Sequence, residues 1–168
     1  MQFDNQAEDP IVITGMGAVS PLGVGVATNW RRLMAGKSGI GPNTRFDVTH
    51  FGSKIAGLVP SKAESPDGFN PLDFMNSKDI RKTDLFIQYA IAATEEALQQ
   101  AGWKPDTDDQ KARTATLIGT GIGGLPVITG AIETLAEKGP RRLSPFVVPA
   151  FLPNLAAGHI SIRYGFSG

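Results

Sequence analysis

The sequence predicts a layered α/β fold, because runs typical of short strands alternate with helical patterns along the chain. The β-branched run 11–14 enters a glycine-rich turn, and a helical pattern follows that turn. A second strand-like run, 114–118, leads into another glycine-rich turn and another helical pattern. Strand, turn and helix in this order form the repeating unit of α/β layers.

The first elements follow directly from the residue types. Residues 11–14 (IVIT) predict a buried strand that ends in the tight turn 15–17. The apolar residues within 30–34 recur at helical spacing, and Gly36 stands where a helix would end. The chain therefore predicts a strand, a loop and a helix at its beginning.

Residues 53–59 alternate enough to predict another strand, and the segment 60–76 that follows is rich in Pro, Ser, Asp and Gly. We interpret 60–76 as a flap rather than a domain linker, since a linker needs no large apolar side chains. Those side chains, expected to hold the flap on the body, are Phe69, Leu72, Phe74 and Met75.

The longest helical pattern covers about 77–101 and ends at Gly102. Small residues on its buried side should let it lie close to a neighbour. These small residues are Ala90, Ala93 and Ala97. The expected polar stripe is formed by Asp84, Gln88, Glu95 and Gln99. The expected apolar face includes Phe86, Ile87, Ile91 and Leu98.

The glycine run 119–124 fits the pattern G-x-G-x-x-G between a predicted strand and a predicted helix that ends at Gly139. This spacing allows a dinucleotide-binding interpretation. The acidic residue expected about twenty positions later is missing, because Glu133 and Glu137 come too early and lie within the helix. The alternative is that these glycines only let the chain turn sharply from strand to helix.

Length, composition and charge narrow the possible classes of protein. A chain of 168 residues with 41% hydrophobic residues is long enough for one domain with an ordinary core. Lys and Arg together number 16, as do Asp and Glu, so no overall charge favours nucleic acid or an anionic membrane as a partner. The absence of cysteine excludes disulfides, cysteine-bound zinc and a thiol nucleophile within these residues.

Residues 1–10 are acidic and polar, and we expect them to form a flexible tail rather than a secretory signal. No later apolar stretch is long enough to span a bilayer. We therefore expect a soluble, cytoplasmic protein without a membrane partner.

An ordered series of motifs covers nearly the whole chain after residue 10. The motifs lie at 11–17 (IVITGMG), 20–23 (SPLG), 30–39 (WRRLMAGKSG), 46–47, 81–84 (RKTD), 119–124 (GTGIGG) and 140–165. Together these motifs resemble the β-ketoacyl-acyl-carrier-protein synthases, and the elongating, type II branch is the most similar.

The resemblance implies a thiolase-like fold, in which two similar halves stack in the layer order αβαβα, usually as a homodimer. Residues 11–168 would form the incomplete N-terminal half. The family joins an acyl chain to malonyl-carrier protein by a decarboxylating Claisen condensation on a cysteine thiolate. No position here matches the family's cysteine, histidines or lysine, so we assign no catalytic residue, metal or cofactor, and we expect this chain alone to be inactive. His159 is interpreted as a structural histidine and His50 receives no catalytic role.

Positions that match the family carry two further expectations. Ile122, in the second glycine-rich turn, would border the acyl pocket as a gate; the alternative is an ordinary core isoleucine. Basic residues would dock the acidic acyl carrier protein, loaded with an acyl or malonyl group. The first group is Lys78, Arg81 and Lys82, whose spacing would place them on one face of the predicted long helix. The second group is the pair Arg141 and Arg142. The alternative is a solvated charged face.

Three functions remain open at this stage. The first is the N-terminal part of a 3-oxoacyl-[acyl-carrier-protein] synthase, an acyltransferase of fatty acid or related polyketide synthesis. The second is a non-catalytic fragment that binds the carrier protein and dimerises. The third, which the missing acidic residue disfavours, is a dinucleotide-binding domain.

Overall fold

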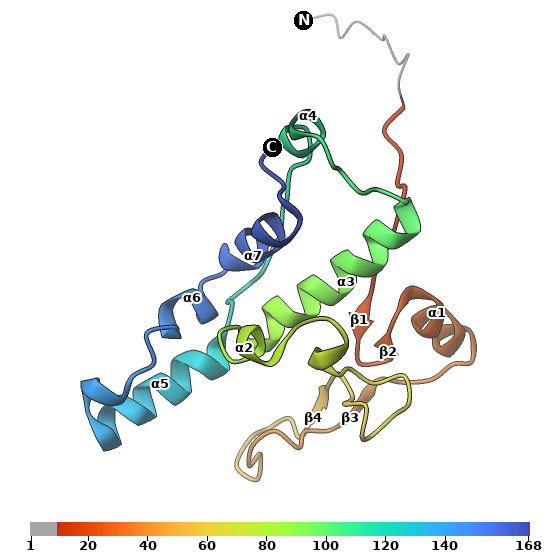
Figure 1. The fold of residues 1–168 in the computed structure, drawn as a ribbon. Helices are drawn as coiled ribbons and strands as arrows, with labels where there is room; N and C mark the ends of the chain where they lie inside the picture. The colour runs from red at the N-terminus through yellow and green to blue at the C-terminus, as the bar shows by residue number, and fades with distance from the viewer. Residues whose placement is uncertain (1–9) are drawn as a thin grey trace, which may run out of the picture.

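The computed structural model describes residues 10–168, so the predicted tail lies outside the described residues except for Pro10. The long helix α3 (Leu85–Ala101) runs through the middle of the molecule, as Figure 1 shows. One small hairpin and α1 lie on one side of α3, a second hairpin lies near α2 (Ser77–Ile80), and α7 (Leu155–Tyr164) packs along the opposite side of α3. Within the described part of the chain, no helix combines the length and apolar character needed to cross a bilayer.

The strands form two separate antiparallel hairpins. In the first, β1 (Val19–Ser20) pairs with β2 (Gly23–Val24), with Val19 opposite Val24. In the second, β3 (Ile40–Pro42) pairs with β4 (Ile55–Gly57), with Ile40 opposite Gly57. The predicted strand 53–59 is thus confirmed in its central part.

The helices account for most of the remaining regular structure. The predicted helix near 30–34 is confirmed as α1 (Val26–Met34), and the one after the second glycine-rich turn as α5 (Leu125–Lys138), which ends at Gly139. The other α-helices are α2 (Ser77–Ile80), α4 (Asp108–Ala112) and α6 (Val147–Phe151). Short 3-10 helices are η1 (Pro71–Asp73) and η2 (Pro140–Arg142).

The core lies between α3 and α7. Ile87 on α3 and Ile160 on α7 are the largest side chains that are almost completely buried. Removing apolar surface from water stabilises a fold by about 25 cal/mol per Å², so burial of these two side chains contributes to the stability of the structure. The rest of the buried cluster is formed by Met75, Ile91, Ala156 and Phe166.

The predicted single helix over 77–101 was wrong, because the chain forms α2 and α3 with a turn between them. Asn76 accepts hydrogen bonds from two backbone N–H groups at the start of α2. The hydroxyl of Thr83 donates to the carbonyl of Asp79 at 2.8 Å, and Asp84 accepts from the N–H of Phe86 to begin α3. Short polar side chains that bond the nearby main chain in this way favour helix ends over helix interiors.

The predicted polar stripe was also wrong at its first two positions, since Asp84 and Gln88 are both buried. The amide nitrogen of Gln88 donates to the carbonyl of Thr83 at 2.9 Å, which stabilises the turn between the two helices. This nitrogen therefore has main-chain partners, whereas the amide oxygen of Gln88 is buried without a hydrogen-bond partner among residues 10–168. The prediction that α3 ends at Gly102 is confirmed.

The predicted strands at 11–14 and 114–118 are absent among the described residues, where both segments are irregular. Ile11 and Leu117 are almost completely exposed. A strand requires hydrogen bonds to a neighbouring strand, and neither segment has one in this structure. β-Branched composition alone therefore does not produce a strand here.

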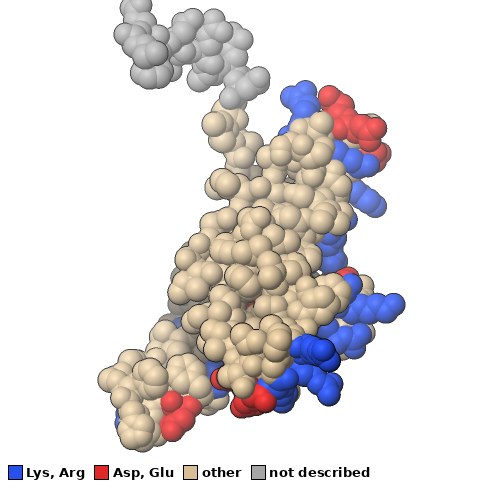
Figure 2. Space-filling view, turned by 90° about the vertical axis from the view of Figure 1, so that its left-hand side faces the viewer, with Lys and Arg blue, Asp and Glu red and all other residues tan. Residues whose placement is uncertain are grey.

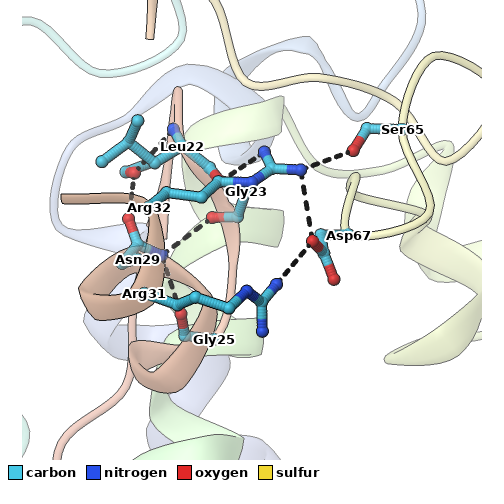
Figure 3. Close-up of polar contacts among 9 residues, drawn as sticks. Leu22, Gly23, Gly25, Asn29, Arg31, Arg32, Ser65 and Asp67 are labelled. Carbon is cyan, nitrogen blue, oxygen red and sulfur yellow. Dashed lines mark hydrogen bonds and ion pairs between the residues drawn. The ribbon is translucent and has the colours of Figure 1, made fainter. Parts of the chain in front are cut away.

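The segment 60–76 is connected to α1 by a charged network (Figure 3). The carboxylate of Asp67 accepts from Arg31 at 2.8 Å and from Arg32 at 3.2 Å. Arg32 also donates to the carbonyl of Leu22 and to the hydroxyl of Ser65. Of the apolar side chains expected to hold this segment, Phe69 and Met75 are buried, Phe74 is half-buried and Leu72 is exposed.

Candidate functional site

The second glycine-rich turn leads into α5 and contacts α6. Gly123 has a φ of +83°, and the N–H of Gly124 donates to the carbonyl of Phe151 at 3.0 Å. A Cβ added to Gly124 would lie 2.9 Å from a carboxylate oxygen of Asp84. Glycine is therefore required at 123 and 124 by backbone conformation and by close approach, whereas a Cβ at Gly119 or Gly121 would meet open space.

This geometry disfavours a dinucleotide at the turn. A pyrophosphate would sit at the first N–H groups of α5, where the helix dipole favours negative charge. The carboxyl group of Asp84 lies against Gly124 at the same end of the helix. A carboxylate there would repel a phosphate. We therefore interpret the turn as the place where α5 packs against α6 and the start of α3.

Ile122 lies immediately before Gly123, and 64% of its surface is exposed in this structure. The N–H of Gly123 donates to the hydroxyl of Thr120 at 3.3 Å, which holds the turn on the other side of Ile122. An exposed apolar side chain on a glycine-rich turn is able to move without disturbing a packed core.

The predicted basic residues lie on two short elements. Lys78 is on α2, Arg81 is the residue that ends α2, and Lys82 follows in the turn before α3, so the three do not share one continuous helix face. Arg141 and Arg142 form the last two positions of η2. Figure 2 shows that Lys and Arg side chains gather along one edge of the face in view, while the middle of this face carries little charge.

One contact joins the turn after α2 to the segment before α6. The ammonium group of Lys82 lies over the ring of Phe146, 4.9 Å from its centroid. Sequence reasoning identified Lys82 but gave Phe146 no role, because no local pattern indicates a contact between residues so distant in the chain. Of the basic residues expected to dock a carrier protein, Lys82 is half-buried and the other four are exposed.

His159 on α7 borders a small cavity of about 220 Å³ that Asp79, Thr83 and Ile162 also line. Its Nε2 atom is buried without a hydrogen-bond partner among residues 10–168. Burial lowers the pKa of this imidazole, and the nearby carboxylate of Asp79 partly opposes the shift. We predicted a structural histidine with its hydrogen bonds satisfied, and the unpartnered Nε2 does not fit the second part of that prediction.

The family model described as "Beta-ketoacyl synthase, N-terminal domain" matches residues 8–168. The chain therefore belongs to the β-ketoacyl synthase family, and the predicted resemblance is confirmed. Within that family, the chain is similar to enzymes named 3-oxoacyl-[acyl-carrier-protein] synthase 2. The one from Rhizobium meliloti (strain 1021) is 49% identical over 158 residues, and these cover 94% of this chain and 38% of that protein.

Two further relatives show the same coverage pattern. The 3-oxoacyl-[acyl-carrier-protein] synthase 2 of Vibrio cholerae is 45% identical, and the mitochondrial 3-oxoacyl-[acyl-carrier-protein] synthase of Arabidopsis thaliana is 41% identical. In both cases the match covers 94% of this chain and 36% of the relative. The chain thus spans less than two fifths of the length of these curated relatives.

Solved structures of ketosynthases share the fold. The β-ketoacyl synthase from Burkholderia phymatum STM815 has a TM-score of 0.72 at 26% identity, covering 94% of this chain and 37% of that one. The ishigamide ketosynthase/chain length factor has a TM-score of 0.71 at 29% identity, and the match covers 91% of this chain and 36% of that one. These similarities confirm the predicted α/β class and its thiolase-like, N-terminal half.

A third solved structure holds a type II polyketide synthase acyl-carrier protein in complex with its ketosynthase, which is bound to the hexaketide. Its TM-score to this chain is 0.67 at 25% identity, covering 93% of this chain and 39% of that one. A ketosynthase with this fold therefore binds a carrier protein.

Proposed function

We propose that these residues are the N-terminal portion of a 3-oxoacyl-[acyl-carrier-protein] synthase that elongates acyl chains in fatty acid or related polyketide synthesis. The observation that carries this proposal is the family match over residues 8–168, together with 49% identity to a synthase of this name. In the reaction, malonyl-carrier protein loses CO₂, and the resulting carbanion attacks an acyl thioester and displaces its thiol. The product is a 3-oxoacyl-carrier protein.

The chain's own residues supply substrate positioning rather than the nucleophile. The family's nucleophile is a cysteine, and this sequence contains none. Acyl transfer to a thiolate divides the condensation into two easier steps, and that chemistry would belong to the remainder of the synthase. We therefore propose that the 168-residue chain does not catalyse condensation by itself.

Docking of an acidic carrier protein is the first positioning role. Lys78, Arg81, Arg141 and Arg142 are exposed, and none of them joins an ion pair with another described residue. Such charges remain available to an acidic partner, and rim charges mainly raise the encounter rate and fix orientation. The carrier-protein complex among the structural relatives supports this proposal.

Gating of the acyl pocket by Ile122 is the second positioning role. Its exposed side chain stands on a turn whose next residue is the positive-φ Gly123. Rotation of such a side chain would widen or narrow a pocket built against it. The expected consequence is a dependence of rate on the length of the acyl chain.

Self-association is supported by the exposed apolar residues. Ile11, Leu117 and Ile162 are more than four fifths exposed, which is costly for an isolated soluble chain. The remainder of the synthase or a second copy of it would cover such surface, consistent with the homodimer that we propose. The same surface is the observation that favours the second candidate function, a non-catalytic fragment that dimerises and binds the carrier protein. A cytoplasmic location remains a proposal, and two relatives are named as mitochondrial synthases.

The decisive experiment compares condensation by the full-length synthase and by the 168-residue chain. Each is incubated with an acyl-loaded and a malonyl-loaded carrier protein, and CO₂ release and 3-oxoacyl product are measured. We expect turnover by the full-length protein and none by the 168-residue chain. Product formation by the 168-residue chain would refute the proposed division of roles, and a full-length protein without turnover would refute the synthase function.

A further inference from the structure

The basic residues proposed to dock a carrier protein differ in how their charges are held. Four are exposed, but Lys82 is half-buried, and its ammonium group lies 4.9 Å from the centre of the Phe146 ring. Lys82 takes part in none of the ion pairs between residues 10–168. The aromatic ring is therefore the neighbour that orients this charge.

The main chain is fixed on the Lys82 side of the contact. The N–H of Lys82 donates to the carbonyl of Asp79 at 3.0 Å, and the hydroxyl of the adjacent Thr83 donates to the same carbonyl at 2.8 Å. Asp84 then begins α3. Because the flanking residues are bonded, the remaining freedom of Lys82 is in its long side chain, which has many rotamers when nothing restrains it.

The main chain is also fixed on the Phe146 side. The N–H of Phe146 donates to the hydroxyl of Ser144 at 3.2 Å, and its carbonyl accepts from Ala150 within α6 at 3.0 Å. Phe146 as a residue is 41% exposed, so it is not part of the buried core. Arg142 lies four positions earlier, in η2. Phe146 thus follows the basic pair of η2 along the chain and contacts Lys82 through its ring.

We propose that Phe146 is a positioning residue that holds the Lys82 ammonium group in place for an acidic carrier protein. This inference rests on the proposed docking function and adds a specific determinant to it. A cation over an aromatic face is attracted by the negative face of the ring while its outer side stays open to an anion. Restricting the lysine side chain before binding also reduces the entropy lost when the partner arrives.

The test uses the full-length synthase and measures the dissociation constant of an acyl carrier protein at low and high salt. Phe146→Leu removes the π face and keeps an apolar side chain, while Phe146→Tyr keeps the face. An exposed cation–π contact corresponds to roughly a twofold to fivefold change in affinity. We expect Phe146→Leu to weaken binding by that factor at low salt, and Phe146→Tyr to retain it.

Two further variants separate positioning from docking. Lys82→Met should weaken binding, and adding Phe146→Leu to Lys82→Met should cause no additional loss, because the ring would have no charge to hold. Phe51→Leu is the matched control, since Phe51 is an exposed ring whose aromatic neighbour is Phe46. It should leave affinity unchanged.

The outcomes distinguish the two proposals. If Lys82→Met weakens binding but Phe146→Leu does not, docking stands and the role of Phe146 is refuted. Equal losses in Phe146→Leu and Phe146→Tyr would also refute it, since the π face would then be irrelevant. If all variants, Lys82→Met included, bind like the wild type, both this inference and the docking role of Lys82 fail, whereas condensing activity would be unaffected.

Discussion

Gly17 lies directly against the main chain of Ala93, so closely that a Cβ added to Gly17 would overlap the carbonyl group of Ala93. Gly15 makes the same kind of approach to Ala97, one turn further along α3. The prediction that small residues let the long helix lie close to a neighbour is confirmed by these contacts. The segment after residue 10 is thus held on α3 by glycine facing alanine.

Gly17→Ala should therefore destabilise the protein. The added methyl group has no space, and overpacking of this kind typically costs about 1–3 kcal/mol. The measurement is the free energy of unfolding in urea. Gly41→Ala is the matched control, because a Cβ at Gly41 meets nothing within 4 Å. An equal effect of the two substitutions would show that Gly17 is not a packing glycine.

Asp67→Asn should loosen the segment 60–76 from α1. The substitution removes the charge that pairs with Arg31 and Arg32, and partly exposed ion pairs contribute about 0.2–1 kcal/mol each. We expect a loss of about 0.5–1.5 kcal/mol in unfolding free energy and faster amide hydrogen exchange within 60–70. Asp47→Asn, which alters a local bond to Thr49 only, should leave exchange in 60–70 unchanged.

Lowering the pH should destabilise the protein through His159. Burial lowers the pKa of His159 below its ordinary value of 6.5, so the unfolded chain binds more protons than the folded chain just below pH 6.5. The contribution of the neutral imidazole to the free energy of unfolding is therefore fully present above pH 6.5 and is lost as the pH falls below that value. Asp79 is the carboxylate that opposes the shift, and Arg163 also lines the cavity.

Urea unfolding at pH 7.5 and pH 5.5 tests this dependence. His159→Phe removes the titrating group, so the difference in unfolding free energy between the two pH values should shrink even if the variant is less stable overall. His50→Asn replaces the exposed histidine and should retain the wild-type difference. An unchanged difference in His159→Phe would assign the pH dependence to other groups.

The helices were largely predictable because their information is local. The apolar spacing within 85–101 and 125–138, with Gly102 and Gly139 at their ends, determines where these helices lie. The break at Thr83 and Asp84 was missed, because helix periodicity does not register a side chain that bonds its own main chain.

The strands and the site depended on information that is not local. Residues 11–14 have the composition of a strand but no neighbouring strand, so their backbone remains unpaired in this structure. Likewise, Lys82 was identified from a family motif, whereas its contact with Phe146 arises only when the segment before α6 packs near the turn after α2. Contacts between distant segments follow from tertiary packing, which residue spacing does not contain.

Removing the proposed docking charges should weaken carrier binding without affecting chemistry. The combined change Arg81→Ala, Lys82→Ala, Arg141→Ala and Arg142→Ala should raise the apparent KM for carrier-linked substrates about fourfold to sixtyfold, if each of the four charges contributes about 0.2–0.6 kcal/mol. The kcat at saturation should change little. The effect should shrink at high salt, because screening weakens exposed charge pairs.

The control for this experiment removes exposed charges elsewhere, with Lys37→Ala and Lys54→Ala together. This pair should leave the apparent KM near the wild-type value. An unchanged KM in the fourfold variant would assign these residues to an ordinary solvated face.

Ile122→Phe should shift the synthase toward short acyl chains. The larger ring would occupy space in the proposed acyl pocket, and the exposed position of Ile122 on its turn means that the fold itself should tolerate the change. We expect condensation of long primers to fall about tenfold or more, while short primers react at near the wild-type rate. The measurement is kcat/KM of the full-length synthase across primers of increasing length. Ile132→Phe, at a similarly exposed position on α5, is the control and should leave the length profile unchanged. An equal loss for every primer in Ile122→Phe would show that this residue supports the structure of the turn and does not gate the pocket.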